Sequence, residues 1–245
     1  MGQKVNSLGL RLGINNKWDS KWYVQRDYNE ILHQDIKIRN FLIRSIEKEN
    51  LIVRKCVIKH SLNKTFVFLH TYGTESDLIK VKLPIIEKVL TTLVGHEVVL
   101  NHLNLIVLNS IYKKIINKVS NELSSFKTRK YFTYGLEVLN AVTLSGSATL
   151  LTTFLANELA KNQRHSQFLD FVKKAIPTFM AVRPNIKGIR IQVAGRINGS
   201  ERKKIDWFRE GQIPLHSLKS KVDYSASTAF TVYGTCGIKV WICSK

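Results

Sequence analysis

The sequence contains few cysteines, few acidic residues and no long hydrophobic run. Its three cysteines, Cys56, Cys236 and Cys243, are odd in number and widely separated. They predict neither a disulfide framework nor a metal site, and we interpret them as reduced structural residues. No run approaches the roughly 18 apolar residues that a membrane-spanning helix needs, and no apolar signal core follows Met1. We therefore expect neither an integral membrane protein nor a secreted precursor.

The shortage of acidic residues is the strongest signal in the composition. The 245 residues include 38 lysines and arginines against 18 aspartates and glutamates, which gives a formal net charge of +20. The excess is spread along the whole chain, although any single lysine is most simply interpreted as solvated. Repulsion at this level destabilises a compact fold unless a polyanion or counter-ions neutralise it. The composition therefore predicts that several surfaces of the protein bind nucleic acid.

Hydrophobic spacing predicts a small α+β domain over residues 24–108, after an irregular amino-terminal arm at 1–23. The pattern is typical of a helix up to Glu49, two strands, a second helix that starts at Pro84, and a last strand that ends near Leu108. The paired strands are expected at 51–59 and 65–71.

A second α+β domain is predicted over residues 147–245, with two helices followed by an antiparallel sheet. The helices are expected at 148–161 and 167–179, and the strands near 189–193, 213–222 and 231–242. Pro177 favours an end or a kink in the second helix. Residues 109–146 are interpreted as a partly helical connector, in which we find no chemistry.

A glycine-containing turn followed by basic residues is the first candidate binding motif. Gly195 and Gly199 let the backbone approach a partner closely, and Arg202, Lys203 and Lys204 follow at once. The spacing matches neither a dinucleotide fingerprint nor a P-loop, both of which need a following helix. Taken alone, this stretch predicts a hairpin with a basic edge.

The stretch that follows, from Trp207 to His216, is the second candidate motif. Arg209 and His216 are suited to contact phosphates or base edges, but His216 is equally consistent with a satisfied polar residue. We favour core positions for Trp207 and Phe208, and pairing of Arg209 with a carboxylate remains an alternative. The acidic residues nearby do not predict a catalytic set, so an enzyme is the weaker hypothesis. They are Asp206, Glu210 and Asp223.

Several further short motifs occur in a fixed order near the two ends of the chain. They are Met1-Gly2-Gln3-Lys4-Val5-Asn6, Gly9-Leu10-Arg11-Leu12-Gly13-Ile14, Gly195-Arg196, Trp207-Phe208-Arg209-Glu210-Gly211, Ile213-Pro214-Leu215-His216, Asp223-Tyr224 and Gly237-Ile238-Lys239-Val240-Trp241-Ile242. In this order and spacing they closely resemble the small-subunit ribosomal protein S-three family. The resemblance covers about residues 1–22 and 188–243, and it is absent for much of 109–146.

The resemblance implies an α+β fold of two domains, the first a type II K-homology domain. It implies a structural, non-enzymatic role in the head of the small ribosomal subunit, beside the messenger path, with no cofactor or metal. The implied partners are small-subunit ribosomal RNA, messenger RNA and neighbouring head proteins, with no membrane. The residues expected to bind ribosomal RNA phosphates are Gln3, Lys4, Arg11, Arg196, Arg202, Lys203, Lys204, Arg209 and His216.

The K-homology part departs from the family pattern at its nucleotide-binding loop. The family carries a Gly-x-x-Gly loop whose glycines let the backbone close on nucleotide phosphates. Alignment from His70 places this loop near residues 79–82, where there is no glycine. We therefore predict a K-homology framework that lacks the usual clamp, in which Lys80 and Lys82 remain available to phosphates.

A second departure concerns the helix that resembles the family's messenger-facing helix. Leu169 and Asp170 replace two arginines there, whereas Lys173 and Lys174 remain as candidate messenger contacts. Because phosphate binding is electrostatic, this change weakens contact with messenger and puts an unwinding role in doubt.

The heavy use of Asn, Ile, Lys and Leu, with the extra residues between the domains, is typical of an organelle-encoded protein from an AT-rich genome. We expect a mitochondrial protein, with a plastid or the bacterial cytoplasm as alternatives. The chain opens with the family start and not with a presequence, and we expect its globular part to end at Lys245. Two other functions stay open: a nucleic-acid-processing enzyme, such as a lyase acting on damaged DNA, and a free K-homology regulator of messenger.

Overall fold

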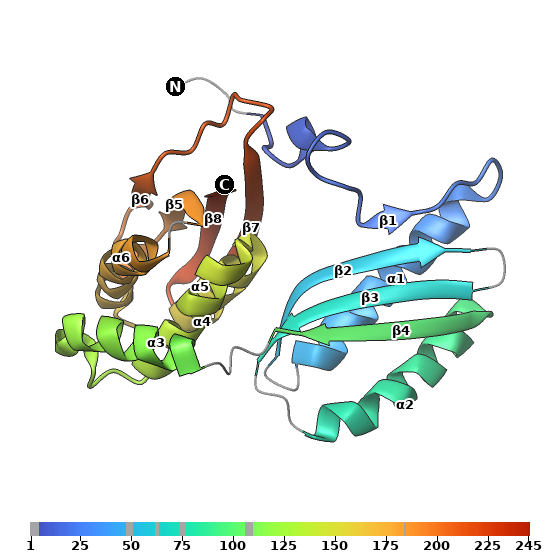
Figure 1. Ribbon diagram of the computed structural model, residues 1–245, viewed down its shortest axis with the longest axis horizontal. Coiled ribbons are helices and arrows are strands. Elements are labelled where there is room, and N and C mark those ends of the chain that lie inside the picture. Colours follow the sequence, from blue (N-terminus) through green and yellow to red (C-terminus); the bar gives the residue numbers. More distant parts are fainter. Residues whose placement is uncertain (1–4, 48–50, 62–63, 74–76, 106–109, 184) are drawn as a thin grey trace. The chain divides into compact units, whose positions relative to one another are not determined.

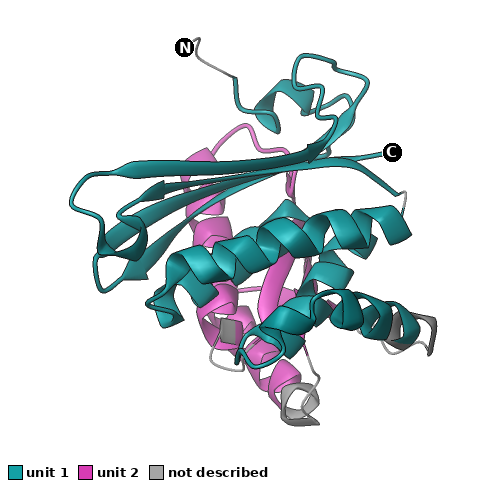
Figure 2. Cartoon of the chain, turned by 90° about the vertical axis from the view of Figure 1, so that its left-hand side faces the viewer, with its two compact units in different colours: residues 1–17, 107–245 teal, residues 18–106 magenta. Residues whose placement is uncertain are grey.

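The computed structural model describes residues 5–47, 51–61, 64–73, 77–105, 110–183 and 185–245 (Figure 1), without the side chains of 47, 77–81 and 110–113. The chain divides into two compact units, which we call the amino-terminal unit (residues 18–106) and the carboxy-terminal unit (residues 1–17 and 107–245; Figure 2). This division differs from the predicted one, because most of the arm and the whole predicted connector belong to the carboxy-terminal unit.

The amino-terminal unit combines a four-stranded sheet with two helices. Its elements are β1 (Ser20–Lys21), α1 (Tyr28–Glu47), β2 (Ile52–His60), β3 (Lys64–Tyr72), α2 (Asp77–Val94) and β4 (Glu97–Asn104). The strand order is β1-β2-β3-β4, in which only the β2–β3 pair is antiparallel. Buried apolar residues from both helices and three strands form its core, among them Leu42, Ile58, Leu69 and Leu90. The predicted order of helix, two strands, helix and strand is confirmed.

Helix α2 occupies the position at which the resemblance places the Gly-x-x-Gly loop. Sequence reasoning starts this helix at Pro84 because proline is favoured in the first turn, but α2 begins at Asp77 and Pro84 lies inside it. Residues 79–82 are therefore helical, and no loop is present there. Lys82 is exposed, whereas the side chain of Lys80 lies outside the described residues.

In the carboxy-terminal unit, helices lie on one side of an antiparallel sheet (Figure 2). The helices are α3 (Ser110–Glu122), α4 (Phe132–Ser145), α5 (Ala148–Lys161) and α6 (His165–Val182), and the strands are β5 (Ile186–Gly195), β6 (Lys204–Gly211), β7 (Lys221–Thr231) and β8 (Gly234–Ser244). Three short 3-10 helices, η1 (Gly9–Arg11), η2 (Ser124–Phe126) and η3 (Ile197–Gly199), complete the unit. The strand order is β6-β5-β8-β7. The protein is therefore of the α+β class, as predicted.

Residues of the predicted connector build the aromatic core of this unit. The ring centroid of Tyr131 lies 5.2 Å from that of Phe168 and 5.4 Å from that of Phe171. Helix α4 is buried along most of its length. A helix that is apolar nearly all round has no amphipathic period, so its sequence does not reveal which face packs. The described side chains of this segment, residues 114–146, thus contribute to the core, and the segment is not a linker between domains.

Two sequence expectations about boundaries in this unit are wrong. Residues 213–220 form a loop and not a strand, and β7 begins at Lys221. Helix α6 does not end at Pro177 but continues to Val182, while a kink at Pro177 stays a prediction. By contrast, α5 has the predicted bounds, and the Ser147 side chain accepts a hydrogen bond from the Leu150 N–H at its start.

Asp223 of β7 ties the sheet to the start of α5. The backbone N–H of Ala148 donates a hydrogen bond of 2.7 Å to Asp223 Oδ2. This N–H belongs to the first turn of the helix, where it has no partner within the helix and where the helix dipole favours a negative charge.

We predict that Asp223→Ala lowers the free energy of unfolding by about 1–2 kcal/mol, because it removes a capping carboxylate. Urea unfolding followed by far-ultraviolet circular dichroism measures the change. Glu201→Ala, which removes an exposed carboxylate from a turn, is the control. Equal stability of the two variants would contradict a capping role for Asp223.

Candidate nucleic-acid interface

The two faces of the carboxy-terminal sheet differ in chemistry. One face packs on the helices: its apolar residues, such as Ile191 and Val240, are buried, and Asp206 on this face forms a 2.8 Å ion pair with Lys173 of α6. Because side chains alternate along a strand, the intervening residues point to the other side. We call that side the open face. It comprises Arg190, Gln192, Ala194, Ile205, Trp207, Arg209, Tyr224, Ala226, Thr228, Phe230, Gly237, Lys239 and Trp241.

The open face is basic and aromatic. None of its positions, all of which lie in described strands, is Asp or Glu. The carboxylates on these strands, Asp206, Glu210 and Asp223, are at the alternate positions that face the helices. This separation of charge produces a surface that attracts an anion.

Trp207 corrects one sequence expectation. We favoured a core position for it, but Trp207 is 63% exposed on the edge strand β6. The neighbouring Phe208 points to the helix face and is half-buried. The two aromatics therefore have different environments, because adjacent residues of a strand lie on opposite faces.

Arg11 corrects another expectation, because its side chain is fully buried. Its Nε donates to the Ser220 carbonyl at 2.8 Å, and its Nη2 donates to the carbonyls of Leu215 at 3.0 Å and Ser217 at 2.8 Å. Its Nη1 donates to the Ser7 carbonyl at 3.0 Å. The guanidinium is thus used within the protein, and Arg11 is not a phosphate-binding residue.

Through these bonds Arg11 holds the loop 212–220 over one end of the open face. Beneath the loop, Ile213 packs with Val222 and Cys243, and Leu215 and Trp241 pack against this cluster. Beside it lies a pocket of about 430 Å³, lined by Arg190, Arg209, Ile213, Pro214, Leu215, His216 and Ser217. The predicted residues Arg209 and His216 therefore meet at one site, joined by Arg190, which the sequence analysis missed.

The alternative pairing of Arg209 with a carboxylate is not present within the described residues. Arg209 Nε donates a long hydrogen bond of 3.4 Å to the Gly211 carbonyl, and Glu210 points to the opposite face. His216 is exposed at the rim of the pocket.

The basic turn, residues 196–204, is anchored to the start of α6. Asn198 has a left-handed backbone with φ of 55°, and its N–H donates to His165 Nδ1 at 3.2 Å. Its side-chain oxygen accepts a hydrogen bond of 3.1 Å from the Ser166 N–H. These bonds fix a turn from which four predicted phosphate-binding residues are exposed. They are Arg196, Arg202, Lys203 and Lys204.

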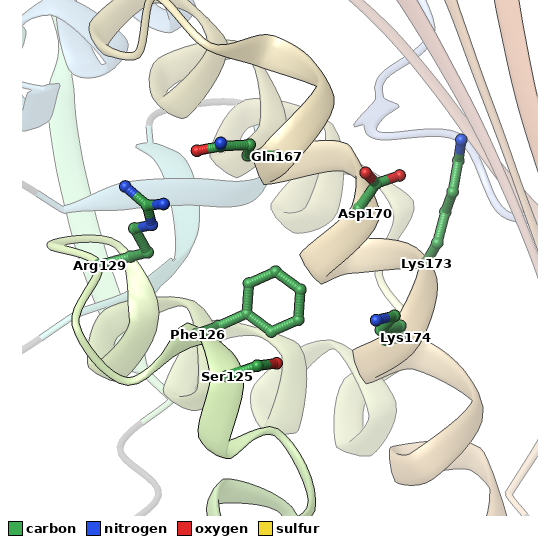
Figure 3. A pocket seen from close by; sticks show the side chains of 7 residues that line it. All are labelled: Ser125, Phe126, Arg129, Gln167, Asp170, Lys173 and Lys174. Atoms are coloured by element: carbon green, nitrogen blue, oxygen red, sulfur yellow. The ribbon is translucent and has the colours of Figure 1, made fainter.

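The predicted messenger contacts lie on α6 and line a second pocket, of about 410 Å³ (Figure 3). Lys173 forms the ion pair with Asp206 described above, and the Lys174 ammonium lies 5.4 Å from the ring centroid of Phe126. Ser125, Phe126 and Arg129 of the predicted connector form one wall, opposite Gln167 and Asp170 of α6. Leu169 is buried, so its side chain is not part of this surface.

The remaining predictions from the sequence do not concern the two pockets or the basic turn. Gln3 and Lys4 are not among the described residues. Within the described part of the chain, no group of three or more His, Cys, Asp or Glu could hold a metal ion. In the same residues, no helix has both the length and the apolar character that a bilayer crossing demands. Burial raises the pKa of the Cys56 thiol to about 11, so this cysteine stays protonated.

Comparison with known proteins assigns the chain to a family. The model of the ribosomal protein S3 carboxy-terminal domain matches residues 156–242, which run from within α5 through most of β8. The small ribosomal subunit protein uS3 of Rhodospirillum centenum is 36% identical over 99% of this chain and 89% of its own length. The chain belongs to the uS3 family. The uS3 proteins of Beijerinckia indica and Granulibacter bethesdensis are each 34% identical over 99% of this chain, and 84% and 89% of their own lengths are covered.

We predict that Arg11→Gln lowers the free energy of unfolding by about 3 kcal/mol, because several buried carbonyls lose their donor. Amide hydrogen exchange in 212–220 should become faster in this variant. Lys219→Gln, an exposed change within the same loop, should alter neither quantity. Unchanged exchange in Arg11→Gln would show that the guanidinium does not hold the loop.

We also predict a pH dependence that comes from His165. Burial lowers the pKa of His165 below its ordinary value of 6.5, so the folded state binds fewer protons than the unfolded state. The stability that this neutral histidine contributes is complete above about pH 6.5 and is lost as the pH falls from there towards the lower folded pKa. Urea unfolding of wild type and His165→Gln, at neutral pH and at about pH 5.5, tests this.

In this comparison the wild type should lose more stability on acidification than His165→Gln does. His33→Gln, an exposed change on α1, should behave as the wild type. Parallel losses in all three proteins would contradict the assignment to His165.

Proposed function

We propose that this protein is a structural constituent of the small ribosomal subunit that binds ribosomal RNA and contacts neighbouring proteins of the subunit head. The observation that carries the proposal is similarity to uS3 proteins over nearly the whole chain. The net charge of +20 supports it, because a polyanion would neutralise the repulsion that this charge creates. Family membership favours a structural role over a DNA-repair lyase or a free messenger regulator.

The ribosomal RNA contacts proposed for the carboxy-terminal unit lie on the basic turn and at the pocket of the open face. They comprise Arg196, Arg202, Lys203, Lys204, Arg209 and His216, with Gln3 and Lys4 added from the sequence. All the described members of this set are exposed, and such contacts position a protein on RNA more than they select a sequence. The amino-terminal unit is proposed to be a K-homology-like domain that lacks the glycine clamp, supported by its helix and strand order.

The messenger contact is proposed for the α6 pocket. Lys174 and Arg129 are exposed there, while Lys173 is partly neutralised by Asp206. A pocket with three cations and the carboxylate of Asp170 attracts phosphate less strongly than an all-basic surface, so we propose a weak messenger contact without strand separation. Composition supports a mitochondrial ribosome as its setting, and the bacterial relatives make the bacterial cytoplasm the main alternative.

Sedimentation of the tagged protein through a sucrose gradient tests the proposed function. The protein should move with the small-subunit ribosomal RNA at moderate and at high salt. A protein that remains at the top of the gradient would contradict the ribosomal role.

For the basic turn, we predict that Arg202→Ala/Lys203→Ala/Lys204→Ala weakens binding to ribosomal RNA. The slope of log affinity against log salt should fall by about one for each lost phosphate contact. Lys114→Ala/Lys118→Ala/Lys127→Ala removes the same charge from exposed positions elsewhere in the unit, and its effect on the slope should be smaller. Equal slopes in the two variants would show that net charge alone matters, and not the turn.

A further inference from the structure

Two arginines face each other across the open face. Arg190 of β5 and Arg209 of β6 are directly paired in the antiparallel register. Like charges at such positions repel and destabilise a sheet, and no carboxylate of the open face compensates them. The pair is therefore an unfavourable feature of the isolated protein that an anion between the two side chains would relieve.

The arginines keep donors for a ligand. The Arg190 guanidinium carbon lies 5.1 Å from the ring centroid of Trp241, and this contact holds the side chain in place. Arg190 Nε is buried and has no hydrogen-bond partner among the described residues. An unsatisfied buried donor is costly, and this one belongs to a residue that lines the pocket beside the loop.

An exposed aromatic ring lies next to the arginine pair. Trp207 is two residues from Arg209 on the same face of β6, which corresponds to a spacing of about 7 Å along the strand. Trp207 is 63% exposed, and Gln192 is its partner across β5. A flat, exposed indole beside paired guanidiniums offers both contacts that a single-stranded nucleic acid needs, a stacking surface for a base and donors for its phosphate.

We propose that the open face binds an unpaired RNA nucleotide, with its base stacked on Trp207 and its phosphate held between Arg190 and Arg209. This inference rests on the proposed function and names one of its contact sites. The nucleotide must be unpaired, because the bases of a duplex are stacked on one another and do not present their faces to a sheet. Charge favours RNA over a protein partner, since the open face carries Arg190, Arg209 and Lys239 and none of its positions is Asp or Glu.

The test measures binding of the full-length protein to an oligouridylate of about ten nucleotides and to a duplex RNA of equal length. Stacking should quench tryptophan fluorescence in the wild type. Trp207→Ala should lower the affinity for oligouridylate about tenfold while changing the affinity for duplex RNA less than about twofold. Trp207→Tyr, which keeps a stacking ring, should bind almost as the wild type does.

Matched variants distinguish binding at the open face from the general effect of losing an aromatic ring or a positive charge. Trp18→Ala removes an exposed tryptophan of the amino-terminal unit, where 64% of Trp18 is exposed, and it should leave oligouridylate binding unchanged. Arg209→Gln should weaken oligouridylate binding more than Lys118→Gln, which removes one exposed cation from α3. Circular dichroism of each variant confirms that it is folded.

Three results would overturn the inference. The first is wild-type affinity of Trp207→Ala for oligouridylate, and the second is an equal loss of affinity for single-stranded and duplex RNA. In the third result, small-subunit proteins shield Trp207 from solvent while oligouridylate causes no quenching. This would assign the open face to a protein partner and would also overturn the inference. Sedimentation of the wild type with the small subunit is a separate readout, so the proposed function can stand when this inference fails.

Discussion

The buried guanidinium of Arg11 is the interaction on which the geometry of the carboxy-terminal unit depends. Its donors reach carbonyls of the loop 212–220 and of Ser7, residues that lie at opposite ends of the chain. A buried arginine is tolerated only where its donors find acceptors, because an unpaired buried charge costs several kcal/mol. The loop supplies them by turning its carbonyls inward, which a strand in a sheet cannot do. The wall of the pocket beside Arg190 is a consequence of this bond network.

In the sheet of this unit, the alternation of side chains along each strand separates charge between the two faces. Carboxylates on the helix face have structural uses: Asp223 accepts from the start of α5, and Asp206 pairs with Lys173. The cations of the open face have no such partners in the described part of the chain. A period-two pattern therefore divides one sheet into a face that stabilises the fold and a face whose charge a partner must neutralise.

The sequence predicts an element correctly where a local signal determines its structure. The bounds of helix α5 follow from its apolar period alone, and the Ser147 cap that the structure adds lies at the predicted start. The sequence does not predict the environment of a side chain where residues distant in the chain determine it. The family resemblance implies that Arg11 binds phosphate, and only its hydrogen bonds to a loop more than 200 residues away show that it is internal. Trp207 was placed in the core because large aromatics are usually buried, but an edge strand with a helix-free face exposes it.

The candidate messenger-facing surface shows the same dependence on distant residues. The exchange of two arginines for Leu169 and Asp170 suggests a simple loss of charge, yet Leu169 is buried. A cation at that position would be desolvated in this fold. The same segment adds Phe126 under Lys174 and places Arg129 opposite Asp170. The segment in which the sequence showed no chemistry therefore supplies a cation and an aromatic ring to the pocket beside the altered position.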